Sequence, residues 1–220
     1  MKGRLLIIFN SEHGYVKRYV DIIGNALGCD AVPAAKFRTK MITGYDKLLF
    51  IGSMRGNLLT GYKHIANDLD VMYKRLAVCG VGMLPYRKKL AERVRNGNIS
   101  VAYEKFIPTF YAQGGFDMSE LTRTERMSMG LTLRQIQAAT SVSDDDTFII
   151  EATQQPVDEV KKSNIQPLID YLDDKTVDPE LYSPPEITDE EEEKKFFEEQ
   201  GEAEKAPTDK KKALKKKLKK

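Results

Sequence analysis

The chain has 220 residues, of which 41% are apolar and 31% charged, and its net charge is +2. No run of about 18 apolar residues occurs, so we expect no membrane-spanning helix, and the apolar run near the start is too short for a cleaved signal peptide. Only two cysteines are present, which excludes a disulfide framework and a four-cysteine metal site and favours a cytoplasmic location.

The first elements predicted along the chain are a strand, a helix and a weaker second strand. The apolar run 4–9 is typical of a buried strand that ends in a loop. Apolar residues then recur every three or four positions from Val16 to Leu27, which predicts a helix that stops at Gly28. Residues 30–35 give a weaker indication of a short strand.

The same alternation of strands and helices continues through the middle of the chain. The pattern predicts a strand, a helix, a strand, a helix after Pro85 and a further strand, over residues 48–51, 58–69, 76–81, 85–94 and 105–111. Because these strands are apolar throughout, the sequence predicts the α/β class, with a doubly wound parallel sheet covered by helices on both faces.

The later part of the domain departs from this alternation. Residues 116–137 are predicted to be a helical insertion, although their apolar residues share no single face. Residues 148–151 are a candidate late strand, and Ser163 or Asn164 is a candidate cap for a final helix.

The charged residues are concentrated in the last part of the chain. We expect residues 1–175 to form the domain and residues 176–220 to form a charged tail, either disordered or a solvated helix, whose removal after Tyr182 leaves folding unchanged. Residues 189–193 are all acidic, and residues 210–220 include eight lysines. The composition of the lysine block favours a solubilising role for this segment, and attraction to an anionic membrane surface is the alternative. We expect no specific nucleic-acid partner.

Three loops that follow predicted strands are the candidate binding segments. In an open α/β sheet, ligands bind beyond the carboxyl ends of the strands. The first loop runs into a helix, where free main-chain amides suit a phosphate, and an ordinary turn is the alternative. The second loop suits contact with a planar polar ring, and the third loop allows a ligand to approach the backbone closely. The candidate binding residues are Ser11, Glu12, His13, Gly14, Tyr15 and Val16, then Ser53, Met54, Arg55, Gly56 and Asn57, then Gly80, Val81, Gly82 and Met83.

Three segments also carry a resemblance to a known family. Residues 7–17 read Ile-Ile-Phe-Asn-Ser-Glu-His-Gly-Tyr-Val-Lys, residues 110–117 read Phe-Tyr-Ala-Gln-Gly-Gly-Phe-Asp, and Arg126 precedes Met127 in a predicted helix. They resemble the flavodoxin-domain family that includes menaquinone-dependent protoporphyrinogen oxidase, over about residues 4–172. The resemblance implies a flavodoxin-like fold, non-covalently bound FMN and redox chemistry at the flavin.

The resemblance also implies roles for the three loops. The first would surround the FMN phosphate, and the other two would border the isoalloxazine ring. Val16 stands where the family usually has threonine or serine, so Ser11 and main-chain amides would hold the phosphate. The chain has no tryptophan, which leaves Tyr86 or Tyr111 to stack on the ring.

Three functions remain open at this stage. The first is an FMN-dependent oxidoreductase, with a protoporphyrinogen-oxidase-like reaction implied by the resemblance and a small molecule or protein as redox partner. The second is a flavodoxin-type electron carrier, against which the nearly neutral domain counts. The third is an interaction module that has lost FMN. No side chain is assigned a catalytic role, because the cofactor supplies the chemistry.

Overall fold

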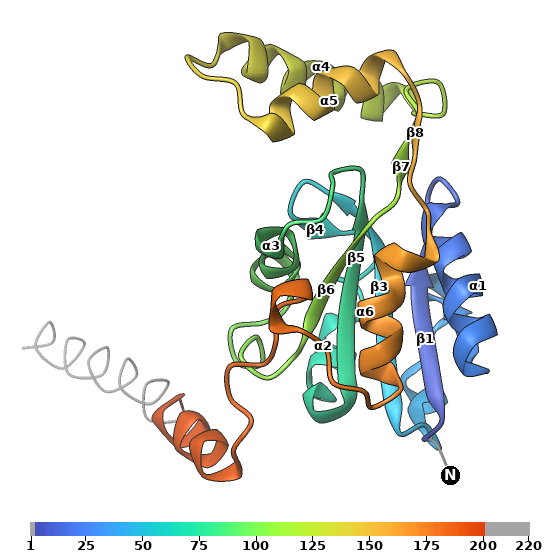
Figure 1. Ribbon diagram of the computed structural model, residues 1–220. Helices are drawn as coiled ribbons and strands as arrows, with labels where there is room; N and C mark the ends of the chain where they lie inside the picture. Colours follow the sequence, from blue (N-terminus) through green and yellow to red (C-terminus); the bar gives the residue numbers. More distant parts are fainter. Residues whose placement is uncertain (1–2, 201–220) are drawn as a thin grey trace, which may run out of the picture.

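The centre of the molecule is a parallel sheet (Figure 1). The computed structural model describes residues 3–200. The strands are β1 (Leu5–Asn10), β2 (Asp30–Pro33), β3 (Lys47–Arg55), β5 (Leu76–Gly82) and β6 (Thr109–Gln113). They pair in the order β2-β1-β3-β5-β6, all parallel, and β4 (Leu58–Leu59) pairs antiparallel with the end of β3. This order is that of flavodoxin-like doubly wound folds, so the predicted fold class is confirmed.

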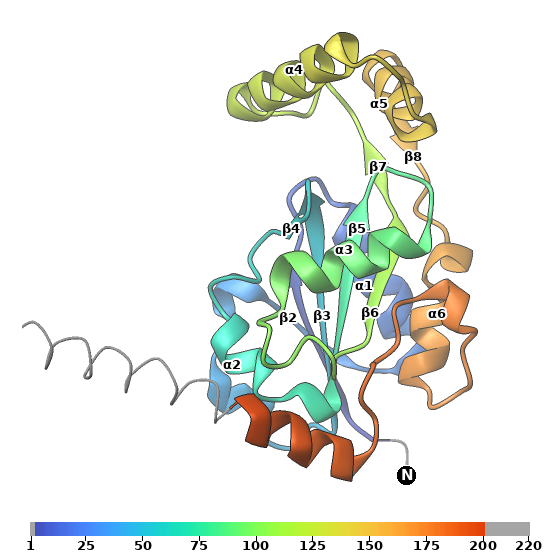
Figure 2. The same ribbon diagram turned by 90° about the vertical axis from the view of Figure 1, so that its left-hand side faces the viewer.

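Helices cover both faces of this sheet, which is why its strands are apolar throughout (Figures 1 and 2). One face is covered by α1 (Tyr15–Leu27) and α6 (Lys162–Leu172), and the other by α2 (Ala66–Asp70) and α3 (Lys88–Asn98). In α1 the buried side chains are Val16, Tyr19, Val20 and Ile23. Within residues 3–200, no helix is both long and apolar enough to cross a bilayer.

Three local predictions are wrong. The helix expected over 58–69 is reduced to α2, because Leu58 and Leu59 form β4 and Gly61 turns the chain with φ +80°. Residues 148–151 are helical rather than a strand. The final helix is capped by neither predicted residue, because it already begins at Lys162.

A helical insertion follows β6 and lies beyond the carboxyl ends of the strands (Figures 1 and 2). It consists of β7 (Gly115–Phe116), α4 (Arg123–Ala138), α5 (Asp144–Gln154) and β8 (Val157–Asp158), and we call residues 115–158 the insertion hairpin. It therefore continues past residue 137, because a second helix leads back to a strand that pairs with β7. Its small apolar core is made by Phe116, Leu121 and Ala152, against which Met83 packs from the loop after β5.

The first part of the charged tail packs against β6, which is an edge strand of the sheet. Ser183 and Thr109 exchange two main-chain hydrogen bonds, of 2.8 and 2.9 Å. Arg95 of α3, only 6% exposed, donates to the carbonyl of Ser183 at 2.9 Å and to the carboxylate of Glu186 at 3.0 Å. A buried guanidinium thus fixes this segment to the domain.

The last described residues, 190–200, are helical and also contact the domain. The ring of Phe197 stacks on Phe106 with centroids 5.3 Å apart, and Glu193 accepts a hydrogen bond from Tyr73 at 2.5 Å. The tail is predicted to be disordered or a solvated helix, and residues 190–200 are helical with no fully buried side chain, although two aromatic side chains of this helix pack on the domain. The lysine block 210–220 lies outside the described residues.

Candidate functional site

The carboxyl ends of β1 and β3 are the topological switch point of the sheet. From β1 the chain crosses to β2 on one side of the sheet, and the remaining strands, β3, β5 and β6, lie on the other side. The loop after β1, the turn between β3 and β4, and the loop after β5 therefore lie at the same end of the molecule. The predicted binding residues come from these three segments, from the ends of β3 and β5 that precede them and from the first turn of α1.

The loop after β1 presents main-chain amides at the start of α1. Gly14 occupies the N-cap position in the left-handed conformation, with φ +82°, and no atom lies within 4 Å of the place a Cβ would take. Ser11 Oγ accepts a hydrogen bond from the amide of Lys17 at 3.2 Å. The amides of Tyr15 and Val16 have no acceptor among residues 3–200, and the first turn of α1 contains no acidic residue. These donors match the requirements of an anion.

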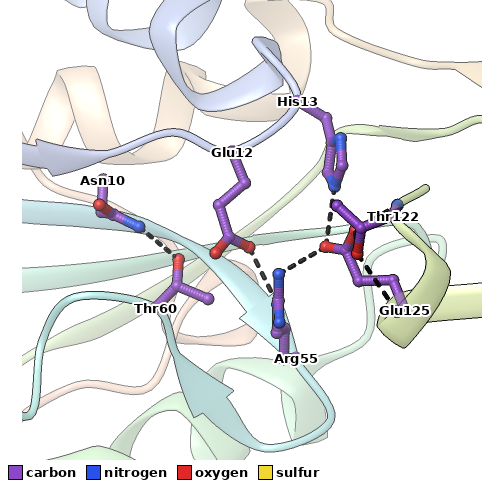
Figure 3. Close-up of polar contacts among 7 residues, drawn as sticks. All are labelled: Asn10, Glu12, His13, Arg55, Thr60, Thr122 and Glu125. Carbon is purple, nitrogen blue, oxygen red and sulfur yellow. Dashed lines mark hydrogen bonds and ion pairs between the residues drawn. The ribbon is translucent and has the colours of Figure 1, made fainter. Parts of the chain in front are cut away.

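The side chains of this loop separate into two groups. Val16 is fully buried in the core, so only its main chain is available for binding. Glu12 is directed away from the start of α1 and pairs with Arg55 Nε of β3 at 3.0 Å (Figure 3). The acidic side chain of the loop is therefore neutralised by a partner from the neighbouring strand.

A second carboxylate joins this ion pair from the insertion hairpin (Figure 3). Glu125 Oε1 lies 2.5 Å from a terminal nitrogen of Arg55 and 3.2 Å from His13 Nε2. The side chain of Glu125 is 13% exposed, whereas that of Arg55 is 53% exposed. Arg55 thus bridges two carboxylates that belong to different parts of the chain.

Glu125 also stabilises the start of its own helix, α4. It forms a capping box with Thr122, in which each residue's side chain accepts from the other's main-chain amide, at 2.7 and 3.3 Å. The hydroxyl and amide of Thr122, followed by His13 and Arg55, lower the pKa of Glu125 to about 2 from its ordinary value of 4.5. The carboxylate is therefore ionised well below neutral pH.

This shift predicts how the hairpin responds to acid. A carboxyl group whose pKa is lowered by folding stabilises the folded state above its ordinary pKa, and this contribution is lost as the pH falls toward the folded value. We expect the stability difference between the wild type and Glu125→Gln to shrink between about pH 4.5 and pH 2. Thermal unfolding of both proteins across this range measures it, and a constant difference would contradict the assignment.

The turn between β3 and β4 is held in place by packing on both sides. Gly56 adopts φ +59° in this two-residue turn, and the carbonyl of Asn57 accepts from the side chain of Asn98 in α3 at 2.9 Å. Ser53 accepts a main-chain hydrogen bond from Thr60 at 2.9 Å. Only Arg55 extends from this turn to the first loop.

Gly80 and Gly82, which lie within β5, have packing explanations in the structure. A Cβ on Gly80 would lie 2.6 Å from Val94 and 2.9 Å from Met54, and one on Gly82 would lie 2.7 Å from the Tyr111 hydroxyl. Val81 is buried in the core. The close approaches at these glycines are therefore made by the protein's own side chains.

The hydroxyl groups of the two candidate stacking tyrosines bind main-chain carbonyls, and the side chain of Tyr111 is buried. Tyr111 is 5% exposed and donates to the carbonyl of Leu84 at 2.9 Å. Tyr86 donates to the carbonyl of Glu180 at 2.8 Å. Both hydroxyl groups thus fix neighbouring segments of the chain.

Sequence reasoning missed the residues that join the insertion hairpin to the domain. Besides Glu125, Asp145 at the start of α5 lies 3.1 Å from Arg87 and 3.4 Å from Lys89, at the start of α3. The spacing of Thr122 and Glu125 matches a capping box and could have placed Glu125 at a helix start. No sequence signal indicates its contact with His13, which is 112 residues away.

Two cavities lie elsewhere, near the amino ends of the strands. One, of about 160 Å³, is lined by residues such as Arg4, Cys29 and Lys47. The other, of about 630 Å³, lies between Tyr73, Leu76 and the described part of the tail. Both are remote from the three loops at the carboxyl ends, so neither belongs to the predicted site.

Neither a protein-family model nor a curated protein sequence matches the chain. Among solved structures, reduced Megasphaera elsdenii flavodoxin is 14% identical over 44% of this chain and 81% of that one, with a TM-score of 0.35. Flavodoxin 2 of Bacillus cereus is 21% identical over 44% and 79%, with a TM-score of 0.34. A flavodoxin from the domain Archaea is 14% identical over 60% and 97%, with a TM-score of 0.37. The order and direction of its strands show that the chain contains a flavodoxin-like domain.

Proposed function

We propose that the chain is a redox flavoprotein that binds FMN non-covalently at the carboxyl ends of β1, β3 and β5. The observation that carries the proposal is the start of α1, where Gly14 is left-handed and the amides of Tyr15 and Val16 have no acceptor among the described residues. Together with the sequence resemblance of residues 7–17, this donor set fits the phosphate of FMN. FMN, when bound, supplies the ability to accept and donate electrons.

The residues of the first loop would bind and orient the phosphate. Ser11 Oγ already accepts a hydrogen bond from Lys17, which leaves its own hydroxyl proton to donate to an anion. Glu12 is paired with Arg55 and does not oppose a negative charge at the start of the helix. The missing Cβ of Gly14 leaves open space in which an oxygen atom can approach the main chain.

Gly14→Val tests this assignment. Valine is strained at φ +82°, and its side chain would fill the open space above the loop. We expect FMN affinity to fall by about tenfold or more, since strain of about 1–2 kcal/mol adds to the lost approach. Titration followed by flavin absorbance or fluorescence measures the change.

Gly24→Ala is the matched control for this variant. Gly24 lies within α1, with no atom within 4 Å of its missing Cβ, so alanine should fit there and leave FMN affinity unchanged. Wild-type affinity in Gly14→Val would place the phosphate elsewhere. A colourless wild-type protein that fails to retain added FMN would reject the flavoprotein proposal itself.

The insertion hairpin favours one class of redox protein over another. An oxidoreductase acting on a small molecule is favoured over a simple carrier, because the insertion hairpin lies beyond the ends of the strands that bear the loops (Figure 1). A protoporphyrinogen-oxidase-like reaction is the finer proposal, and it rests on the sequence resemblance. Reoxidation of the reduced flavoprotein by a quinone or reduction by a porphyrinogen supports it, whereas exchange with a ferredoxin alone supports the carrier.

An interaction module without FMN is the second candidate, and one contact favours it. Arg55 spans the switch point between β1 and β3, where it binds Glu12 and Glu125. If that bridge is permanent, it occupies space a ring would need. Failure of FMN to bind, with an otherwise stable protein, supports this candidate. A membrane role for the lysine block remains a separate proposal, which salt-sensitive binding to anionic vesicles would test.

A further inference from the structure

Two side chains at the switch point, His13 and Arg55, are both occupied by one carboxylate of the insertion hairpin. His13 immediately precedes Gly14, and Arg55 ends β3, so both stand next to the loop proposed to bind phosphate. Glu125 Oε1 contacts both of them, at 3.2 and 2.5 Å (Figure 3). An anionic oxygen thus already lies where these two side chains converge.

The contact is made by a segment that joins the domain through one short strand pair. Glu125 belongs to the first turn of α4, and the insertion hairpin containing it is attached to the domain through the short pair β7 and β8. Its other polar attachments at this end are ion pairs, such as that of Asp145 with Arg87 at 3.1 Å. These contacts are polar and few, so a ligand that offers Arg55 an anionic oxygen can replace the one that Glu125 supplies.

We infer that Glu125 is an internal competitor for an anionic ligand at His13 and Arg55, so that the closed hairpin and the bound anion use the same two side chains in turn. The inference rests on the proposed function and adds a regulation of that site. When the anion is a phosphate, its charge repels Glu125 and attracts Arg55, which is 53% exposed and free to reorient. Binding then releases α4 from the domain, and release of the ligand restores the contact.

Glu125→Gln separates this competition from the structural role of the residue. Glutamine replaces glutamate in capping boxes, so the bonds with Thr122 can persist while the negative charge is lost. We expect Glu125→Gln to bind FMN about threefold to tenfold more tightly than the wild type, because like charges no longer oppose each other. Riboflavin, which lacks the phosphate, should bind both proteins equally.

Glu151→Gln is the matched control, because it removes the same charge from an exposed residue of α5 that does not contact His13 or Arg55. Its effect on FMN affinity should be smaller than that of Glu125→Gln. If Glu125→Gln weakens FMN binding, or tightens FMN and riboflavin alike, the competition does not exist. In either case wild-type binding of FMN would leave the proposed function standing.

Hydrogen exchange provides a measurement that does not depend on flavin. In the wild type, FMN or inorganic phosphate should accelerate amide exchange in α4, and Glu125→Gln should show faster exchange without any ligand. If inorganic phosphate accelerates exchange and FMN does not, the site binds a free anion rather than the cofactor. Unchanged or slower exchange in α4 with both ligands would overturn the inference.

Discussion

A chain that ends at Tyr182 should lose most of its folding stability. The deletion removes the carbonyl of Ser183 and the carboxylate of Glu186, which bind the buried guanidinium of Arg95. Leaving a buried charge without partners costs about 3–5 kcal/mol, and native domains have only about 5–15 kcal/mol in total. The loss of Phe197 from Phe106 adds to this cost.

Chemical denaturation of three chains measures the contribution of this segment. A chain that ends at Gln200 keeps every described contact and is the reference. In the chain that ends at Tyr182, Arg95→Met should recover part of the lost stability, because it removes the stranded charge. Equal stability of the chain that ends at Tyr182 and the chain that ends at Gln200 would show that residues 183–200 contribute nothing to folding.

Asp70→Ala is expected to have the second largest effect. Asp70 is 3% exposed and accepts hydrogen bonds from the hydroxyl of Tyr62 at 2.5 Å and from the amide of Ser100 at 3.0 Å. It therefore ties α2 to the segment that follows α3. Alanine leaves two donors without an acceptor, each at a cost of about 1–3 kcal/mol, so unfolding should become easier by about 3 kcal/mol or more.

Two further variants serve as references for the effect of Asp70→Ala. Asp68→Ala changes an exposed aspartate of α2 and should cost less than about 1 kcal/mol. Asp70→Asn keeps one acceptor oxygen and should be milder than alanine. Urea unfolding measures all three, and an Asp70→Ala protein as stable as Asp68→Ala would show that the buried bonds are replaced by water.

The central sheet could be predicted because its strands are buried on both faces. Continuous apolar runs such as 48–51 and 76–81 locate β3 and β5, although the strand β3 extends to Arg55. The same argument failed over 58–69, where apolar spacing typical of a helix is overridden by a hairpin and by Gly61. Periodicity records which residues are buried and not which backbone conformation buries them.

The contacts of the tail with the domain could not be predicted, because composition averages over its residues. Two adjacent phenylalanines among acidic and lysine residues are enough to hold residues 190–200 against the aromatic side chain of Phe106. The bonds of Arg95 to Ser183 could not be foreseen either, since a lone arginine on a helix is usually solvated. Such contacts depend on the path of the chain after α6.

The candidate site was located by a rule about parallel sheets, which places loops at the carboxyl ends of strands. The open space at Gly14 agrees with that rule, whereas Gly80 and Gly82 are explained by the packing of Met54 and Tyr111. Sequence alone could not separate these two reasons for glycine. It also could not show that Arg55 meets Glu125, because the two belong to different elements.

The pairing of β7 with β8 gives the insertion hairpin coincident ends. Gly115 stands opposite Asp158 and Phe116 opposite Val157, so the chain leaves β6 and returns toward α6 at almost the same point. Such a segment can be lengthened, shortened or exchanged without altering the register of the sheet beneath it. The insertion hairpin can therefore vary while the sheet is preserved, and such variation can change which ligand binds at the carboxyl ends of the strands.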